Sequence, residues 1–201
     1  MINGAKIGVL ILAAGSSSRL GYAKQLVEFN GKSLLQHAID VSNELDFDIK
    51  VLVLGAKNVE IASKINLKEF EVIVNNNWEV GMSSSIMEGV LKSQELEHKL
   101  DHIVILLSDQ PFVNKEQIQR LIQVQLHTNS PATFSEYDDV GVPAIFSAEV
   151  FHELKALKGH QGAKKLIANH RFTFETVKFE KGNFDVDTED DVALLKQMEA
   201  Q

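Results

Sequence analysis

Two short runs of consecutive apolar residues constrain this chain more than any other feature. Residues 7–12 (IGVLIL) and 103–107 (IVILL) are apolar throughout, and both are followed by small or polar residues. Runs of this length are typical of strands buried on both faces, as in a parallel sheet covered by helices. Pro111 follows the second run closely and cannot continue a central hydrogen-bond ladder. We therefore expect residues 7–12 to form the central strand and Asp109 to lie at the C-terminal edge of a second buried strand.

Segments of strand and helix character alternate along the rest of the chain. Ser33 precedes apolar residues at helical spacing, and Asn114 with Gln117 has the spacing of a capping box. Gly89 weakens the helical pattern that contains it. Further strands are expected at 51–54, 72–74, 132–134, 144–146 and 172–177, and further helices at 59–65 and 83–94 and after Thr188.

This alternation favours an α/β fold with three layers, αβα. Its centre would be a mostly parallel, twisted, Rossmann-like sheet, and ligands would bind beyond the C-terminal ends of its strands. The 201 residues suffice for one sizeable core. We therefore expect a single domain over 1–201, with the less regular half after residue 131 forming one side of the ligand cleft.

Composition argues against several classes of function. A formal net charge of -8 argues against nucleic acid as a partner, because binding along a phosphate backbone needs clustered surface cations. The chain contains no cysteine, so it has neither disulfides nor thiolate metal sites. Neither a signal-peptide pattern nor an apolar stretch of membrane-spanning length is present. We expect a cytoplasmic protein without a membrane partner.

A loop of small residues with two cations follows the first apolar run. Residues 13–24 read AAGSSSRLGYAK, so backbone N–H groups can approach phosphate oxygens while Arg19 and Lys24 neutralise a triphosphate. The spacing matches neither a Walker loop nor a dinucleotide-binding fingerprint. Taken alone, the loop could also be a flexible serine-rich turn with solvated cations.

The same residues resemble a known signature. Residues 10–15 (LILAAG) with Ser17, Arg19, Gly21 and Lys24 resemble the nucleotidyltransferases of the GT-A type. More narrowly, the whole chain is similar to the molybdenum cofactor cytidylyltransferase branch of the MobA-like NTP transferase family, whose members join CTP to molybdopterin. The supporting segments are 77–85 (NWEVGMSSS), 109–111 (DQP), 141–146 (GVPAIF), 159–163 (GHQGA) and 185–190 (DVDTED).

The resemblance implies transfer of CMP from CTP, or of another nucleotide from its NTP, to a phosphorylated small molecule with release of pyrophosphate. The acceptor would be molybdopterin, and a molybdoenzyme would receive the product. Residues 1–130 would bind the nucleotide and 131–201 the acceptor. The implied catalytic residues are Arg19, Lys24 and Asp109. The implied nucleotide contacts are Leu12, Ala13, Ala14, Gly15, Ser16, Ser17, Arg19, Lys24, Gly81, Ser83 and Ser84.

The resemblance also implies Mg2+, with Asp109 and Asp187 as its ligands. A hard cation of this kind prefers carboxylate and phosphate oxygens. Taken as isolated residues, both aspartates could equally be an edge carboxylate and a helix cap. Asp185 competes with Asp187 as the second ligand, because alternate residues of an extended segment share a face.

Two departures from the family pattern fall on the acceptor side. Val142 stands where a basic or polar residue is common, and His160 where an acidic residue is usual. The acceptor's identity is therefore less constrained than the reaction. As a lone loop histidine, His160 is either a general base or a hydrogen-bonded bystander.

The first loop also indicates which nucleotide base the protein prefers. Relatives that resemble this chain but use GTP tend to read Leu-Ala-Gly-Gly where residues 12–15 here read LAAG. The methyl group of Ala14 narrows a packed pocket floor against a larger purine, which favours cytosine.

Three other readings compete with cytidylyl transfer to molybdopterin. A sugar- or polyol-phosphate nucleotidyltransferase would use the same loop and metal. A catalytically idle relative would bind nucleotide only, which the intact Arg19, Lys24, Asp109 and Asp187 disfavour. A generic doubly wound binding domain would match the first loop by coincidence, which the second matching segment at Asp109 disfavours.

Overall fold

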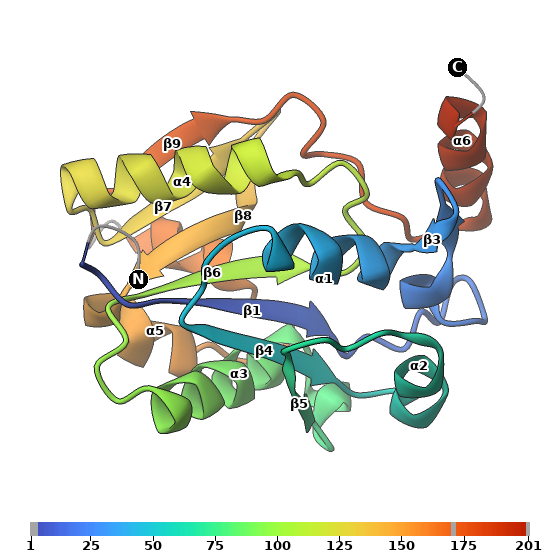
Figure 1. The fold of residues 1–201 in the computed structure, drawn as a ribbon, viewed down its shortest axis with the longest axis horizontal. Helices are drawn as coiled ribbons and strands as arrows, with labels where there is room; N and C mark the ends of the chain where they lie inside the picture. The colour runs from blue at the N-terminus through green and yellow to red at the C-terminus, as the bar shows by residue number, and fades with distance from the viewer. Residues whose placement is uncertain (1–3, 170–171, 200–201) are drawn as a thin grey trace.

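The computed structural model describes residues 4–169 and 172–199, and Figure 1 shows their fold. Seven strands of this described part form one sheet in the order β5-β4-β1-β6-β8-β7-β9. The first four are parallel to one another, β8 is antiparallel to both β6 and β7, and β9 is parallel to β7. The bounds are β1 (Ile7–Ala13), β4 (Ile49–Leu54), β5 (Glu71–Val74), β6 (His102–Leu107), β7 (Ala132–Glu136), β8 (Val140–Ser147) and β9 (Glu175–Lys178). The mostly parallel sheet is confirmed.

The two apolar runs form neighbouring strands inside the sheet. Ile11 of β1 pairs with Leu52 of β4 on one side and with Leu106 of β6 on the other. All seven residues of β1 are buried, as expected for a strand covered on both faces. The middle position in the strand order belongs to β6, one place from β1.

Helices cover both faces of the sheet, which gives the three predicted layers (Figure 1). Alternate residues of β1 point to opposite faces, so Ile11 and Leu10 belong to different core clusters. The first cluster includes side chains from α1 (Leu34–Asn43), α2 (Asn58–Lys64) and α4 (Lys115–Thr128). The second includes side chains from α3 (Met82–Leu96) and α5 (Phe151–Lys155).

Local sequence signals explain where several elements begin. Ser33 Oγ accepts a hydrogen bond from Gln36 N at 3.3 Å, and Asn114 Oδ1 accepts one from Gln117 N at 2.9 Å. Both predicted N-caps are thus confirmed. The capping box at Asn114 is incomplete, since no hydrogen bond from Asn114 N to the Gln117 side chain is found among the described residues. Gln117 Nε2 instead donates to Ser135 Oγ of β7 at 3.1 Å.

Gly89 has a packing role inside α3. A Cβ atom at this position would lie 2.4 Å from Leu10 Cδ1, so the absence of a side chain lets α3 pack closely on β1. The stability gained from this close packing outweighs the cost of the low helix propensity of glycine. The strand expected at 172–177 is shorter than predicted, because β9 begins only at Glu175.

A third cluster closes the C-terminal edge of the sheet. The strands β2 (Glu28–Phe29) and β3 (Lys32–Ser33) form a small hairpin, and Phe29 packs in a cluster with Val186 and with residues of α6 (Glu189–Glu199). Val186 N donates to Asp109 O at 3.0 Å, which joins the segment before α6 to the end of β6. No helix in the described ranges is both long and apolar enough to cross a membrane.

Candidate active site

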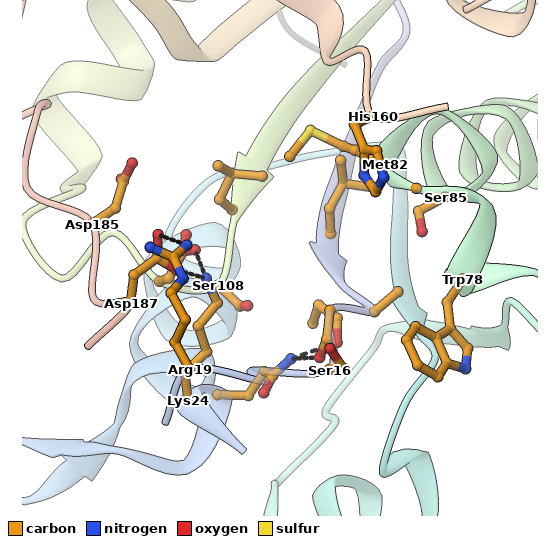
Figure 2. A pocket seen from close by; sticks show the side chains of 18 of the residues that line it. Ser16, Arg19, Lys24, Trp78, Met82, Ser85, Ser108, His160, Asp185 and Asp187 are labelled. Carbon is orange, nitrogen blue, oxygen red and sulfur yellow. Dashed lines mark hydrogen bonds and ion pairs between the residues drawn. The ribbon is translucent and has the colours of Figure 1, made fainter. Parts of the chain in front are cut away.

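A cleft of about 530 Å³ opens at the C-terminal ends of β1 and β6. This is the edge where open parallel sheets bind ligands, as the sequence predicts. Figure 2 shows Trp78 and Ser85 on one side of the cleft and Arg19, Lys24 and Asp187 on the other. The cleft wall includes these residues expected from sequence: Leu12, Ala13, Ala14, Gly15, Ser16, Arg19, Lys24, Gly81, Asp109 and Asp187.

The loop after β1 is held in a defined shape by Gln25, which is 1% exposed. Gln25 Nε2 donates to Ala13 O at 2.9 Å and to Gly15 O at 3.1 Å. Ser17 has a positive φ of 55°, and its Oγ accepts from Lys24 N at 3.0 Å. The loop is therefore no loose serine-rich turn, and its fold carries Lys24 back to the cleft.

Gly15 keeps part of the cleft wall free of side chains. A Cβ atom at Gly15 would meet no heavy atom of the described residues within 4 Å, and its φ lies outside the positive range. Neither packing nor backbone strain therefore requires glycine here. The open space fits close approach of a ligand to the backbone.

Two cations and two carboxylates meet at one end of the cleft. Lys24 Nζ donates to Asp109 Oδ2 and, at 2.6 Å, to Asp187 Oδ1. Arg19 Nη2 donates to Asp187 Oδ2 at 2.8 Å. The fold thus brings together residues that are far apart in the sequence. They come from the first loop, from the end of β6 and from the segment before α6.

The charges of this cluster support one another. Burial alone would lower the pKa of Lys24, but Asp109 and Asp187 outweigh it and the pKa is raised. Burial opposes the charge of Asp187 as well, but Lys24 and Arg19 lower its pKa overall. Nearby Asp185 also lines the cleft, and burial together with the negative charge of Asp109 raises the pKa of Asp185 to about 6.

The two carboxylates that share Lys24 have the chemistry of a divalent-cation site. Asp109 Oδ1 is buried and has no hydrogen-bond partner among the described residues, so it retains a free acceptor. Carboxylate oxygens are the ligands that Mg2+ and Mn2+ prefer. No group of three or more His, Cys, Asp or Glu in residues 4–169 and 172–199 is placed to hold a metal. Phosphate oxygens and water would therefore have to complete the coordination.

The opposite wall is formed around the N-terminus of α3. Gly81 has a φ of 119°, and a Cβ atom there would lie 2.4 Å from Gly159 O. Asn75 Nδ2 donates to Ser84 Oγ at 2.8 Å and to Ser85 Oγ at 3.0 Å. The 159–160 loop and the start of α3 are therefore fixed to each other and to the end of β5.

Three of the expected nucleotide contacts lie behind the wall of this cleft rather than in it. Ser17 shapes the first loop, Ser83 N donates to Gly159 O at 3.2 Å, and Ser84 Oγ is bonded to Asn75 and to Gly81 O. Other wall residues were not assigned a site role from sequence, although four of them stand in the matching segment 77–85: Gln25, Trp78, Glu79, Met82, Ser85, Leu107 and Ser108.

A second cavity of about 230 Å³ adjoins the cleft. Leu12, Met82 and Leu107 line both spaces. The second cavity includes Gly141 and Val142 of one segment expected on the acceptor side, and Gly162 and Ala163 of the other. His160 lines the first cleft, near Met82, as Figure 2 shows.

Comparison with known proteins agrees with this geometry. Residues 9–174 match the family model of the MobA-like NTP transferase domain. The chain is similar to nicotine blue oxidoreductase of Paenarthrobacter nicotinovorans, 26% identical over 197 residues that cover 94% of this chain and 93% of that protein. It is also similar to purine catabolism protein PucB of Bacillus subtilis strain 168, 28% identical over 204 residues that cover 95% and 96% of the two.

One similar structure contains a metal ion. Rv0371c from Mycobacterium tuberculosis H37Rv, solved as a complex with manganese, superposes with a TM-score of 0.81. Its identity to this chain is 28%, and the match covers 96% of this chain and 99% of that one.

Proposed function

The chain is a nucleotidyltransferase that belongs to the MobA-like NTP transferase family, and from this premise we propose that it transfers CMP from CTP to molybdopterin. The reaction releases pyrophosphate and forms a new phosphate–phosphate linkage. Residues 1–130 supply the nucleotide side of the cleft and residues after 131 the acceptor side. A molybdenum enzyme that takes up the finished cofactor is the corresponding protein partner.

One observation supports this proposal more than any other. Lys24 is bonded to both Asp109 and Asp187, next to a wall of small residues whose backbone is open to a ligand. Phosphoryl transfer needs positioning and charge neutralisation far more than covalent chemistry from the protein. Two cations, two carboxylates and an accessible backbone at one strand edge supply those needs.

The cations act on the charge that develops during transfer. An oxygen of the acceptor's phosphate attacks the α-phosphorus of CTP in line, the bond to the β-phosphate oxygen breaks, and pyrophosphate leaves. Arg19 and Lys24 neutralise the α-phosphate and the departing pyrophosphate, where negative charge increases. The second pKa of the attacking phosphate is about 6, so this phosphate is largely ionised at neutral pH and needs no strong general base.

Asp109 and Asp187 are the residues that would hold Mg2+. Asp109 Oδ1, which has no hydrogen-bond partner in the described part of the chain, and the shared approach of both carboxylates to Lys24 fit such an ion. When bound, the ion would neutralise charge on the phosphate oxygens. Lys24 and Arg19 would then exchange their carboxylate partners for phosphate oxygens of the nucleotide.

Ala14 supports cytosine as the base. It is 6% exposed and lines the cleft, so its methyl group forms part of the wall that a bound base would meet. A purine, which is larger than cytosine, has less room beside this methyl group. One methyl group discriminates by about 1–3 kcal/mol, so CTP is preferred over GTP without GTP being wholly excluded.

The direct test is pyrophosphate release with each of the four nucleoside triphosphates, combined with molybdopterin, glucose 1-phosphate and a polyol phosphate. We expect CTP with molybdopterin to give the highest kcat/KM in the presence of Mg2+. Turnover with glucose 1-phosphate or the polyol phosphate, but not with molybdopterin, would identify a sugar- or polyol-phosphate nucleotidyltransferase instead. Nucleotide binding without pyrophosphate release from any pair would identify a catalytically idle protein.

A further inference from the structure

The second cavity continues the active-site cleft into the half of the chain after residue 131. Leu12, Met82 and Leu107 form part of both walls, so a molecule bound at the Lys24 end can extend into the second space. Tyr137 lines that space, and burial, together with the charges of Asp185 and Asp139, raises the pKa of Tyr137.

The lining of this cavity is poor in hydrogen-bonding side chains. Its floor is apolar and includes Ile86, Ile105 and Val142. Among the described residues that line it, only Tyr137, Asp139 and Lys164 have polar side chains. A polyhydroxylated acceptor would leave buried hydroxyl groups without partners, which is unfavourable. The cavity therefore fits a planar ring whose faces contact apolar side chains better than it fits a polyhydroxylated chain.

Two of the three polar side chains are bonded to each other. Lys164 Nζ forms an ion pair with Asp139 Oδ2, which joins the β7–β8 turn to η4 (Ala163–Asn169). Asp139 Oδ1 also accepts from Val140 N at 2.8 Å, and Asp139 O accepts from Tyr137 N at 2.8 Å. The turn thus fixes Asp139, whereas Lys164 has a long, flexible side chain that is 49% exposed.

From this arrangement we propose that Lys164 recognises an anionic group of the acceptor, and that Asp139 holds Lys164 until the acceptor arrives. This inference rests on the proposed function, because it concerns the acceptor of that reaction. The acceptor is then an anion with a planar ring body, in contrast to a sugar or polyol phosphate. Exposed ion pairs contribute little net stability, so Lys164 can exchange Asp139 for a ligand anion at small cost.

If Lys164 exchanges Asp139 for the acceptor's anion, replacing Lys164 and replacing Asp139 should have opposite effects on acceptor binding. Lys164→Ala removes the recognising charge and should raise the KM for molybdopterin about tenfold, the scale of one charge-assisted hydrogen bond. Asp139→Asn removes the competitor and should lower the same KM about twofold to threefold. Lys164→Arg keeps the charge and should stay close to the wild type. The KM for CTP should remain unchanged in all three, because neither residue lines the nucleotide cleft.

Lys165→Ala is the matched control. Lys165 is the next residue of the same element, but it lines a different cavity. Its replacement should leave both KM values unchanged, and melting temperatures should confirm that every variant is folded.

The outcomes separate this inference from the proposed function. If the wild type releases pyrophosphate with molybdopterin but Lys164→Ala has an unchanged KM for it, Lys164 is not the recognising residue. Preference of the wild type for glucose 1-phosphate would overturn the planar-ring acceptor. If no acceptor supports pyrophosphate release, the proposed function fails. Equilibrium binding of molybdopterin to wild type and Lys164→Ala then decides the role of Lys164 independently, and equal affinities overturn it.

Discussion

Lys24 Nζ is bonded to Asp109 Oδ2 and, at 2.6 Å, to Asp187 Oδ1. One ammonium group therefore occupies the point on which the two proposed metal ligands converge. A divalent cation and this ammonium group compete for the same carboxylate oxygens. Nucleotide phosphates give Lys24 and Arg19 alternative partners, so metal and nucleotide should each favour the binding of the other.

Replacing Lys24 by alanine should separate metal binding from catalysis. Loss of the ammonium frees both carboxylates, so Mn2+ should bind the nucleotide-free protein about tenfold more tightly, the scale of one charge-assisted hydrogen bond. Turnover with CTP should fall more than nucleotide affinity, because the lost contact strengthens as charge develops. Electron paramagnetic resonance titration gives the Mn2+ affinity, and steady-state kinetics give kcat and KM.

Arg19→Ala is the comparison for that experiment. Arg19 forms its ion pair with Asp187, and its side chain is 66% exposed, so its loss should change Mn2+ affinity less while still lowering kcat. Unchanged or weaker Mn2+ binding in Lys24→Ala would show that Lys24 does not compete with the metal. If Lys24→Ala or Arg19→Ala raised the KM for CTP at constant kcat, the lost contact would bind the ground state and the transition state equally. That result would rule out a specific role in the transition state.

The choice between Asp187 and Asp185 as the second metal ligand gives another prediction. Asp187 shares Lys24 with Asp109 and is bonded to Arg19, whereas burial and the charge of Asp109 raise the pKa of Asp185 to about 6. Asp187→Asn should therefore abolish measurable Mn2+ binding, and Asp185→Asn should retain most of it. The reverse order of Mn2+ affinities in calorimetric titrations would assign the ligand to Asp185.

Two glycines of the cleft wall should respond to alanine in opposite ways. Gly15→Ala meets no described neighbour within 4 Å, so stability should be unchanged while CTP binding weakens. Gly81→Ala places a Cβ atom 2.4 Å from Gly159 O at a φ of 119°, and should lower the free energy of unfolding by about 1–3 kcal/mol. Urea unfolding and CTP titration of both variants check this. Loss of stability in Gly15→Ala would show that this glycine serves the fold.

Ala14→Gly tests the choice of base. Removal of the methyl group should relax the preference for CTP toward GTP and loosen the loop through added backbone freedom. The measurement is kcat/KM for both nucleotides in the parent and the variant. A parent that prefers GTP, or a ratio that the substitution leaves unchanged, would remove Ala14 as the reason for cytosine.

Sequence patterns predicted the sheet because its strands depend on local or repeating signals. Apolar runs marked β1 and β6, and the side chains of Ser33 and Asn114 marked helix starts. The motif residues Arg19, Lys24, Asp109 and Asp187 do meet. Local signals thus sufficed for these strands and helix starts, whereas the grouping of the four motif residues came from the resemblance to the family.

Features that depend on tertiary packing could not be predicted in this way. Gln25 fixes the first loop from a buried position, and a glutamine carries no pattern that predicts burial. Ser84 stands in a matching motif, but its hydroxyl group is bonded to Asn75 and Gly81. The pairing of Lys164 with Asp139 joins η4 to the β7–β8 turn, and only the folded sheet brings these two segments together.

The central claim is that Asp109 takes part in nucleotidyl transfer as a charged carboxylate, and Asp109→Asn tests it most directly. Asparagine keeps the size of the side chain, and the Asp109 carbonyl that accepts from Val186 N is unaffected. Pyrophosphate release from CTP and molybdopterin at saturating Mg2+ should fall at least about 100-fold, with a melting temperature close to that of the wild type. Normal turnover by the asparagine variant under these conditions would contradict the account.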